Sequence, residues 1–142
     1  MNEREFKART KDLALRVVRM VGALPKNQME LQIISRQLLR SATSVGANYR
    51  AACRAKSTAD MISKLSIVLE EADESLYWME ILVESGLVPE YKLKNLMAET
   101  NEIVSMLVAS LKTLRSKSKQ SRIYNSAQSK ISNLQSSMKH ES

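Results

Sequence analysis

Basic residues recur between residues 36 and 56 at a spacing that favours phosphate binding. They are Arg36, Arg40, Arg50, Arg54 and Lys56. On a helix over about residues 28–54, with about 100° per residue, the four arginines point within about 40° of one direction. The planar guanidinium group binds phosphate through two hydrogen bonds, and phosphate contacts supply most sequence-independent affinity. The pattern predicts a surface that binds RNA or DNA, and its alternative is a solvated arginine face.

The same stretch lacks the features that read bases. No aromatic residues alternate with the arginines to stack single-stranded bases, and the pattern of a recognition helix is absent. We therefore expect contact driven by charge and shape rather than by base sequence. A second alternative is that the arginines dock onto acidic surfaces of neighbouring copies or of another protein.

The next predicted helix, over about residues 58–85, carries acidic, apolar and aromatic residues on the side away from its expected core face. These residues are Ile67, Glu70, Glu74, Tyr77, Trp78 and Ile81. Large apolar side chains on an outer face usually mark a contact surface, with Trp and Tyr as anchors. A basic helix and an acidic helix on every copy suit a repeating head-to-tail contact, so we predict self-association. The alternative is a central helix that buries both of its sides.

The carboxylates do not form a metal-binding pattern. A di-metal site in a helical bundle needs paired Glu-x-x-His motifs, and the chain has a single histidine, His140. With one cysteine, Cys53, the chain also lacks the residues for a disulfide, a Cys/His zinc site or a histidine-based triad. We therefore expect no metal, no cofactor, no small-molecule substrate and no catalytic residue, as in a protein that is not an enzyme.

The elements that position these residues are predicted to be helices. The 142 residues include only 3 Gly and 2 Pro, which leaves little room for the turns of a sheet. Apolar residues recur every three or four positions in four segments, at about 3–23, 28–54, 58–85 and 90–115. Short connections between them predict an all-α, up-down-up-down antiparallel four-helix bundle over residues 1–115.

Local signals place the ends of these helices. Asn27 with Glu30 three residues later resembles a capping box for the second helix, and Ser57 with Asp60 repeats the signal for the third. Gly86 marks the expected end of the third helix.

Residues 116–142 form a basic serine-rich tail. Five basic residues against one acidic residue give the tail a charge of +4, more than half of the +7 of the whole chain. Its apolar residues are sparse, so we expect a mobile or weakly helical segment. No apolar run approaches about 18 residues and no signal-peptide pattern opens the chain, so we expect a cytoplasmic protein without a membrane partner.

Two stretches resemble a known family. Residues 38–52 read LLRSATSVGANYRAA, and residues 70–80 read EEADESLYWME. Together they resemble the bacterial four-helix-bundle family of proteins encoded in 23S rRNA intervening sequences. The accessory variability determinant of diversity-generating retroelements belongs to the same family. The resemblance covers about residues 5–115.

The resemblance implies a homopentameric ring of antiparallel bundles without known catalysis. For the retroelement branch it also implies a basic protein that binds nucleic acid and has a reverse transcriptase as partner. It carries over Asn48 as a structural position and the basic character of Arg40 and Arg50. Many members continue after this Asn with Ile-Ala-Glu-Gly, where this chain has YRAA at residues 49–52, which indicates a distinct branch.

Overall fold

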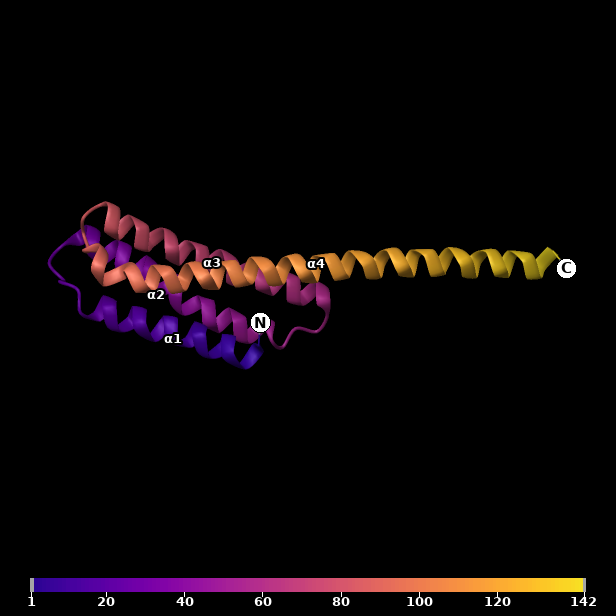
Figure 1. Ribbon diagram of the computed structural model, residues 1–142, viewed down its shortest axis with the longest axis horizontal. Helices are drawn as coiled ribbons and strands as arrows, with labels where there is room; N and C mark the ends of the chain where they lie inside the picture. The colour runs from indigo at the N-terminus through magenta and orange to yellow at the C-terminus, as the bar shows by residue number, and fades with distance from the viewer. Residues whose placement is uncertain (1, 142) are drawn as a thin grey trace.

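Four helices make up the fold in the computed structural model, which describes residues 2–141 and the side chains as far as residue 139, so the His140 side chain lies outside it. The helices are α1 (Glu3–Gly22), α2 (Met29–Ala52), α3 (Thr58–Glu84) and α4 (Glu90–Glu141). α1, α2, α3 and the first half of α4 lie together as a bundle (Figure 1). The described residues contain no strand, so the predicted all-α class is confirmed.

Two of the three predicted helix-end signals are confirmed. The Ser57 hydroxyl caps α3 by accepting a hydrogen bond from the Asp60 N–H at 3.1 Å. Gly86 follows α3 with φ +77°, a conformation that glycine adopts without strain. The capping box at Asn27 is wrong: α2 begins at Met29, so Gln28 holds the cap position and makes no side-chain cap hydrogen bond.

The core is mainly aliphatic, with Phe6 and Tyr49 as its buried aromatic residues. Fully buried side chains come from all four helices and include Phe6, Leu13, Leu38, Met79 and Leu107. Such close-packed apolar burial is the main source of stability in a bundle of this kind.

Direct contacts fix which helices are neighbours. In the interior between α2 and α3, the Ser75 hydroxyl donates to the Ser41 hydroxyl at 2.9 Å. α2 also passes close to α1, because a Cβ built at Gly46 would lie 3.4 Å from the backbone of Thr10. Gly46 does not interrupt α2, which runs unbroken from Met29 to Ala52.

α4 corrects the predicted end of the fourth helix. It does not stop near residue 115 but continues as one helix to Glu141. Leu111 is its last buried residue among those described, and the helix then leaves the bundle and projects alone (Figure 1). The physical reason is that the chain has no glycine or proline after Pro89, so nothing stops the ladder of backbone hydrogen bonds. At 1.5 Å per residue, the 26 residues beyond 115 extend about 40 Å.

Candidate nucleic-acid interface

The five predicted phosphate-binding residues are all exposed, but they do not form one helical stripe. α2 ends at Ala52 with Cys53 as its C-cap, so Arg54 and Lys56 lie in the connection to α3. The placement of Arg54 on the second helix is therefore wrong. The turn is held by the Arg54 N–H, which donates to the Ala51 carbonyl at 3.1 Å.

Arg40, in the middle of the predicted stripe, is engaged within the chain. Its guanidinium donates to the Glu71 carboxylate at 3.3 Å and also to the Glu74 carboxylate. Both acids belong to α3, so Arg40 links α2 to α3 across the outside of the bundle. Because two carboxylates balance its charge, Arg40 offers less attraction to a phosphate than an unpaired arginine.

Arg36 lies one turn before Arg40 but far from Arg50, the other basic residue of α2. It is 14 positions before Arg50, a separation of about 21 Å along a helix. It lines a small cavity of about 150 Å³ at the turn between α1 and α2, together with Lys26 and the Ser35 hydroxyl. This hydroxyl is buried and has no hydrogen-bond partner among the described residues.

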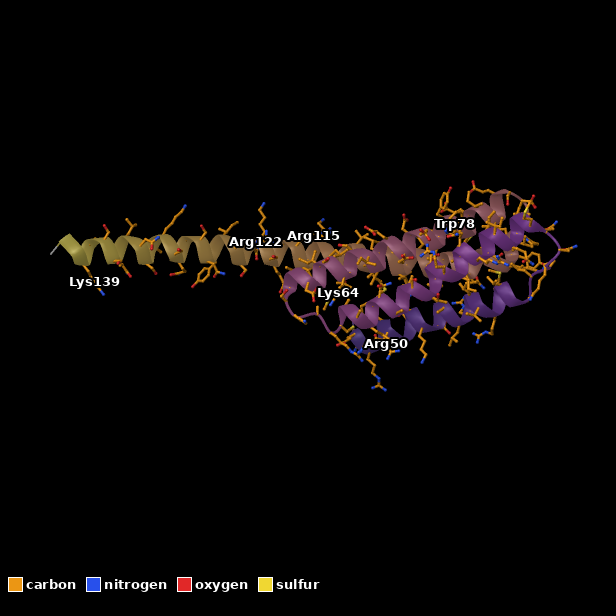
Figure 2. All side chains as sticks on the ribbon, turned by 180° about the vertical axis from the view of Figure 1, so that it is seen from behind. Arg50, Lys64, Trp78, Arg115, Arg122 and Lys139 are labelled. Atoms are coloured by element: carbon orange, nitrogen blue, oxygen red, sulfur yellow. The ribbon has the colours of Figure 1, made fainter. Side chains whose placement is uncertain are left out.

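Arg50 instead lies beside two lysines of α1. Lys7, Lys11 and Arg50 line a groove of about 500 Å³ between α1 and α2. The groove has a floor of small residues, which are Ala8, Ala14, Thr43, Gly46 and Ala47. Arg50 extends away from the bundle (Figure 2), whereas the Lys7 ammonium lies 3.3 Å from the Glu3 carboxylate. Three cationic side chains along a groove that is otherwise lined by small residues suit the binding of a phosphodiester backbone.

A second basic group lies where α4 leaves the bundle. Lys117 and Arg122 of α4 line a hollow of about 300 Å³ with Thr58, the first residue of α3. The start of a helix carries partial positive charge from its unpaired N–H groups, so this hollow also favours anions. Arg122 lies on the exposed part of α4 (Figure 2).

The two basic groups lie at the same end of the bundle. A pocket of about 480 Å³ is lined by residues from the start of α1, the end of α2, the start of α3 and the middle of α4. Figure 1 shows the start of α1 and the connection between α2 and α3 at the end from which α4 projects. We call this surface the basic end and define it by Lys7, Lys11, Arg50, Arg54, Lys56, Lys117 and Arg122.

Acidic residues at the basic end are held by local partners. The backbone nitrogen of Lys56 and the Lys64 ammonium each lie 3.0 Å from the Asp60 carboxylate. Both contacts lower the pKa of Asp60, and the hydrogen bond from the Lys56 N–H has the larger effect. Asp60 therefore stays ionised and organises the start of α3 rather than adding a free negative charge to the surface.

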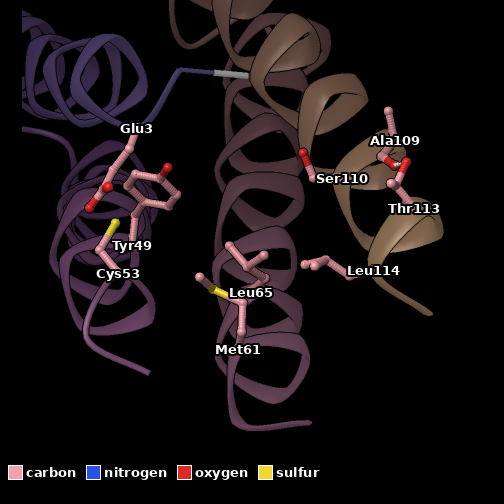
Figure 3. A pocket seen from close by; sticks show the side chains of 9 residues that line it. All are labelled: Glu3, Tyr49, Cys53, Met61, Leu65, Ala109, Ser110, Thr113 and Leu114. Atoms are coloured by element: carbon pink, nitrogen blue, oxygen red, sulfur yellow. Dashed lines mark hydrogen bonds between the residues drawn. The ribbon is translucent and has the colours of Figure 1, made fainter. Parts of the chain in front are cut away.

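The pocket at the basic end does not have the chemistry of a nucleophilic site. Glu3, Tyr49 and Cys53 lie together on one side of it (Figure 3). The other lining residues are Met61, Leu65, Ala109, Ser110, Thr113 and Leu114. Burial raises the pKa of the Cys53 thiol, and burial likewise raises the pKa of Tyr49. A thiol with a raised pKa is a weak nucleophile at neutral pH. The described residues contain no group of three or more His, Cys, Asp or Glu side chains that could hold a metal ion.

The predicted interface residues of α3 divide into two groups. Ile67, Glu70 and Tyr77 are exposed, whereas Trp78 and Ile81 are half-buried and Glu74 contacts Arg40. Trp78 packs against the edge of the core, and its ring lies 5.0 Å from that of Tyr77 in an edge-on arrangement.

The Trp78 indole N–H is fully buried without a hydrogen-bond partner among the described residues. The large apolar side chains that stay exposed on the outer face of α3 are Ile67 and Tyr77, ten positions apart. Trp78 belongs partly to the bundle itself.

Sequence reasoning did not include Lys7, Lys11, Lys117 and Arg122 among the binding residues. The signal for them was present in the predicted order of the helices. Short connections bring the start of the first helix, the end of the second and the start of the third to one end, where the fourth also finishes. Because residues 116–142 are predicted as a separate tail, Lys117 and Arg122 of α4 are absent from the predicted binding residues.

Comparisons with known proteins agree with the fold. A model of the 23S rRNA-intervening sequence protein family matches residues 3–109. A crystal structure of a protein of unknown function from the S23 ribosomal protein family of Bacteroides thetaiotaomicron is 35% identical, with a TM-score of 0.72. The match covers 79% of this chain and 99% of that chain. No curated protein matches the chain.

The described helices include none that is both long and apolar enough to cross a membrane. Most of the bundle lies within the matched range, whereas most of the projecting part of α4 lies beyond it. On the strength of the match over residues 3–109, the chain belongs to the 23S rRNA-intervening sequence protein family.

Proposed function

We propose that this protein is a non-enzymatic, homo-oligomeric accessory protein that binds structured RNA or DNA through its basic end. The observation that carries the proposal is the gathering of cations from α1, α2, the α2–α3 connection and α4 at one end of the bundle. These cations neutralise phosphates irrespective of base sequence. The residues that line the groove of Lys7, Lys11 and Arg50 include no aromatic side chain, so stacking of bases plays no part in that groove.

Oligomerisation would strengthen this binding. The family resemblance supports a homopentameric ring of up-down-up-down antiparallel bundles, in which every copy presents its basic end on the same face. Several weak contacts to one nucleic acid then act together, because binding at one copy raises the effective concentration at the next. The exposed Ile67 and Tyr77 of α3 supply an apolar contact for such assembly.

The test is the salt dependence of binding to a duplex DNA and a hairpin RNA, measured by fluorescence anisotropy. For duplex DNA, each phosphate contact contributes about 0.9 to the slope of log affinity against log salt concentration. The triple variant Lys11→Ala, Arg50→Ala, Lys117→Ala is expected to reduce that slope by about 2 to 3.

The matched control removes the same type of charge from the opposite end of the bundle. Lys26→Ala, Lys92→Ala and Lys94→Ala change three exposed lysines near the other two helix connections. This variant should keep the original slope. If both triple variants reduce the slope equally, net charge alone determines the salt dependence. If neither reduces it, the basic end is excluded as the binding surface.

The second candidate function is a protein-interaction scaffold. It is supported by the pairing of Arg40 with acids of α3 in the same chain, which leaves this predicted phosphate contact less available to nucleic acid. Under this proposal, Ile67→Asp with Tyr77→Asp abolishes binding of other copies or of a protein partner, while nucleic-acid affinity per chain stays constant. Sedimentation velocity of the variant and the anisotropy measurement together separate the two functions.

A further inference from the structure

The projecting part of α4 has an apolar seam that nothing in the described chain covers. The seam consists of Tyr124, Ala127, Ile131, Leu134 and Met138. Its four large members are 47 to 69% exposed. Helices in proteins owe most of their stability to the packing of such a face, so a solitary helix with an exposed seam lacks its usual support.

The spacing of the seam identifies its partner as another helix with the same repeat. The five residues step by three and four, which fills positions a and d of two successive heptads and the a position of the next. A repeat of 3.5 residues keeps one seam facing a neighbouring helix over its whole length. Ile131 at an a position with Leu134 at a d position is the combination that favours two-stranded coils.

The charge pattern of residues 124–138 also permits pairing with a second copy of this chain. Residues that flank the seam in a coiled coil, at positions e and g, include Gln128, Gln135 and Ser137, with Lys130 as the single charged residue over 124–138. Like charges at these positions would repel an identical helix. Lys130 occupies a g position, where a parallel partner presents the uncharged Gln135 at its e position, so no like charges meet and two copies can approach.

The bundle does not obstruct such a partner. On the helical wheel the seam points roughly 140° away from the side of α4 that carries Ile103, Leu107 and Leu111 into the core. A second helix can therefore lie along the projecting segment without meeting α1, α2 or α3 of the same chain. The outward side of α4 within the bundle continues with small exposed residues, which are Ala98, Ser105, Ala109 and Ser116.

We propose that residues 124–138 form a parallel coiled coil with the same segment of a second copy of this chain. The parallel arrangement places each seam residue opposite its own counterpart, so all five find apolar partners. An antiparallel arrangement pairs a with d positions, and because the seam has three a residues and two d residues, one a residue is left without an apolar partner. The segment lies outside the matched family range of residues 3–109, so this contact is additional to any ring formed by the bundles.

The first experiment tests the parallel register in the full chain. Ala127→Cys is made in a Cys53→Ser background and oxidised mildly at micromolar concentration. Parallel pairing brings the two introduced thiols together, so a covalent dimer should form at least ten times faster than with Ser129→Cys, which lies on the outer side of the helix. Equal rates for the two variants, or no dimer from either, would overturn the proposal.

The second experiment separates the seam from the proposed ring and from nucleic-acid binding. Ile131→Asn with Leu134→Asn should raise the dissociation constant for self-association at least tenfold in sedimentation velocity, whereas Tyr91→Asn at the other end of α4 should not. An unchanged melting temperature shows that the bundle remains folded. If the bundles also form a ring through α3, the ring persists while the cross-link at position 127 is lost.

Two results of this second experiment count against the seam. If the double variant keeps both its self-association and the cross-link at position 127 but binds RNA less tightly, the segment serves nucleic acid and the coiled coil is excluded. If it keeps both and binds RNA normally, the seam has no partner and the proposal is overturned as well.

Discussion

The guanidinium of Arg40 lies 3.3 Å from a carboxylate oxygen of Glu71, on the neighbouring helix of the same chain. Glu74 accepts a second hydrogen bond from the same guanidinium. Arg50, ten residues later on the same helix, lines a groove with two lysines instead. Two arginines of one helix therefore have opposite electrostatic surroundings. The first holds α2 to α3, and the second is available to a phosphate.

This contrast predicts different effects for two alanine substitutions. Arg40→Ala should lower the free energy of unfolding by up to about 1 kcal/mol, because the half-exposed ion pair is screened by water. The loss should shrink as salt is added. Urea unfolding at low and high salt measures it.

Arg50→Ala is the matched comparison for that measurement. It should leave the unfolding free energy nearly unchanged and weaken nucleic-acid binding, whereas Arg40→Ala should leave binding nearly unchanged. A larger binding loss for Arg40→Ala than for Arg50→Ala would contradict the assignment of the basic end.

The close approach of α1 and α2 predicts a size limit at Gly46. Its added Cβ would lie 3.4 Å from the Thr10 backbone, which leaves room for a methyl group but not for a branched side chain. Gly46→Ala should be neutral or stabilise the bundle by less than about 1 kcal/mol, because alanine restricts the unfolded chain and favours helix.

Gly46→Leu, in contrast, should destabilise the bundle by about 1–3 kcal/mol by forcing the helices apart. Thermal unfolding of the two variants distinguishes these outcomes. Equal stability of both would mean that the helices do not approach closely at this position.

The helices of the bundle could be predicted because their signals are local. Apolar spacing located all four segments, and the Ser57 cap and Gly86 stop act on residues only a few positions away. The end of α4 could not be predicted in the same way. Sparse apolar residues indicated little packing, but a helix can continue past its last buried residue where nothing interrupts it. Glycine and proline interrupt helices most strongly, and neither follows Pro89.

The candidate site was predicted less completely because it depends on contacts between helices. The wheel placed Arg40 and Arg50 on one side of α2 but contained no information about Glu71, which neutralises one of them. Lys7 lines the groove because α1 packs beside α2 at Gly46, a contact between helices that the wheel of α2 alone does not contain. For Trp78, a wheel drawn for one helix missed the neighbouring surface that half-covers the ring.

The buried indole N–H of Trp78 predicts that phenylalanine replaces tryptophan well. An unsatisfied buried donor costs about 1–3 kcal/mol, so removing it offsets the loss of apolar area. Trp78→Phe should change the free energy of unfolding by less than about 1 kcal/mol. Trp78→Ala should cost about 2–3 kcal/mol, less than for a fully buried ring.

Urea unfolding at two protein concentrations separates folding from assembly for these variants. If Trp78→Phe weakens assembly at low concentration as strongly as Trp78→Ala, then the indole N–H has a partner in the oligomer. That result would restore the interface role that the sequence predicted for Trp78.

The environment of Cys53 predicts slow reaction with thiol reagents. Burial raises the pKa of this thiol, and the carboxylate of Glu3 raises it further. A smaller thiolate fraction at pH 8 slows alkylation. Modification by iodoacetamide should therefore be slower than for the same chain in urea, and Glu3→Gln should accelerate it. A folded-state rate equal to the unfolded rate would contradict the burial of the thiol.

The lowered pKa of Asp60 predicts that the start of α3 contributes stability only while Asp60 is ionised. The backbone N–H of Lys56 and the Lys64 ammonium both favour the charged carboxylate. The stabilising effect of the Asp60 carboxylate is therefore complete above the ordinary pKa of 3.8 and is lost as the pH falls through the lower native pKa.

Asp60→Asn should reduce the melting temperature at pH 7, and below the native pKa of Asp60 the melting temperatures of the variant and the unsubstituted protein should converge. Asp73→Asn, an exposed acid on the same helix, should show no comparable gap at pH 7. A gap for Asp60→Asn that persists undiminished into strong acid would trace its effect to side-chain packing instead of charge.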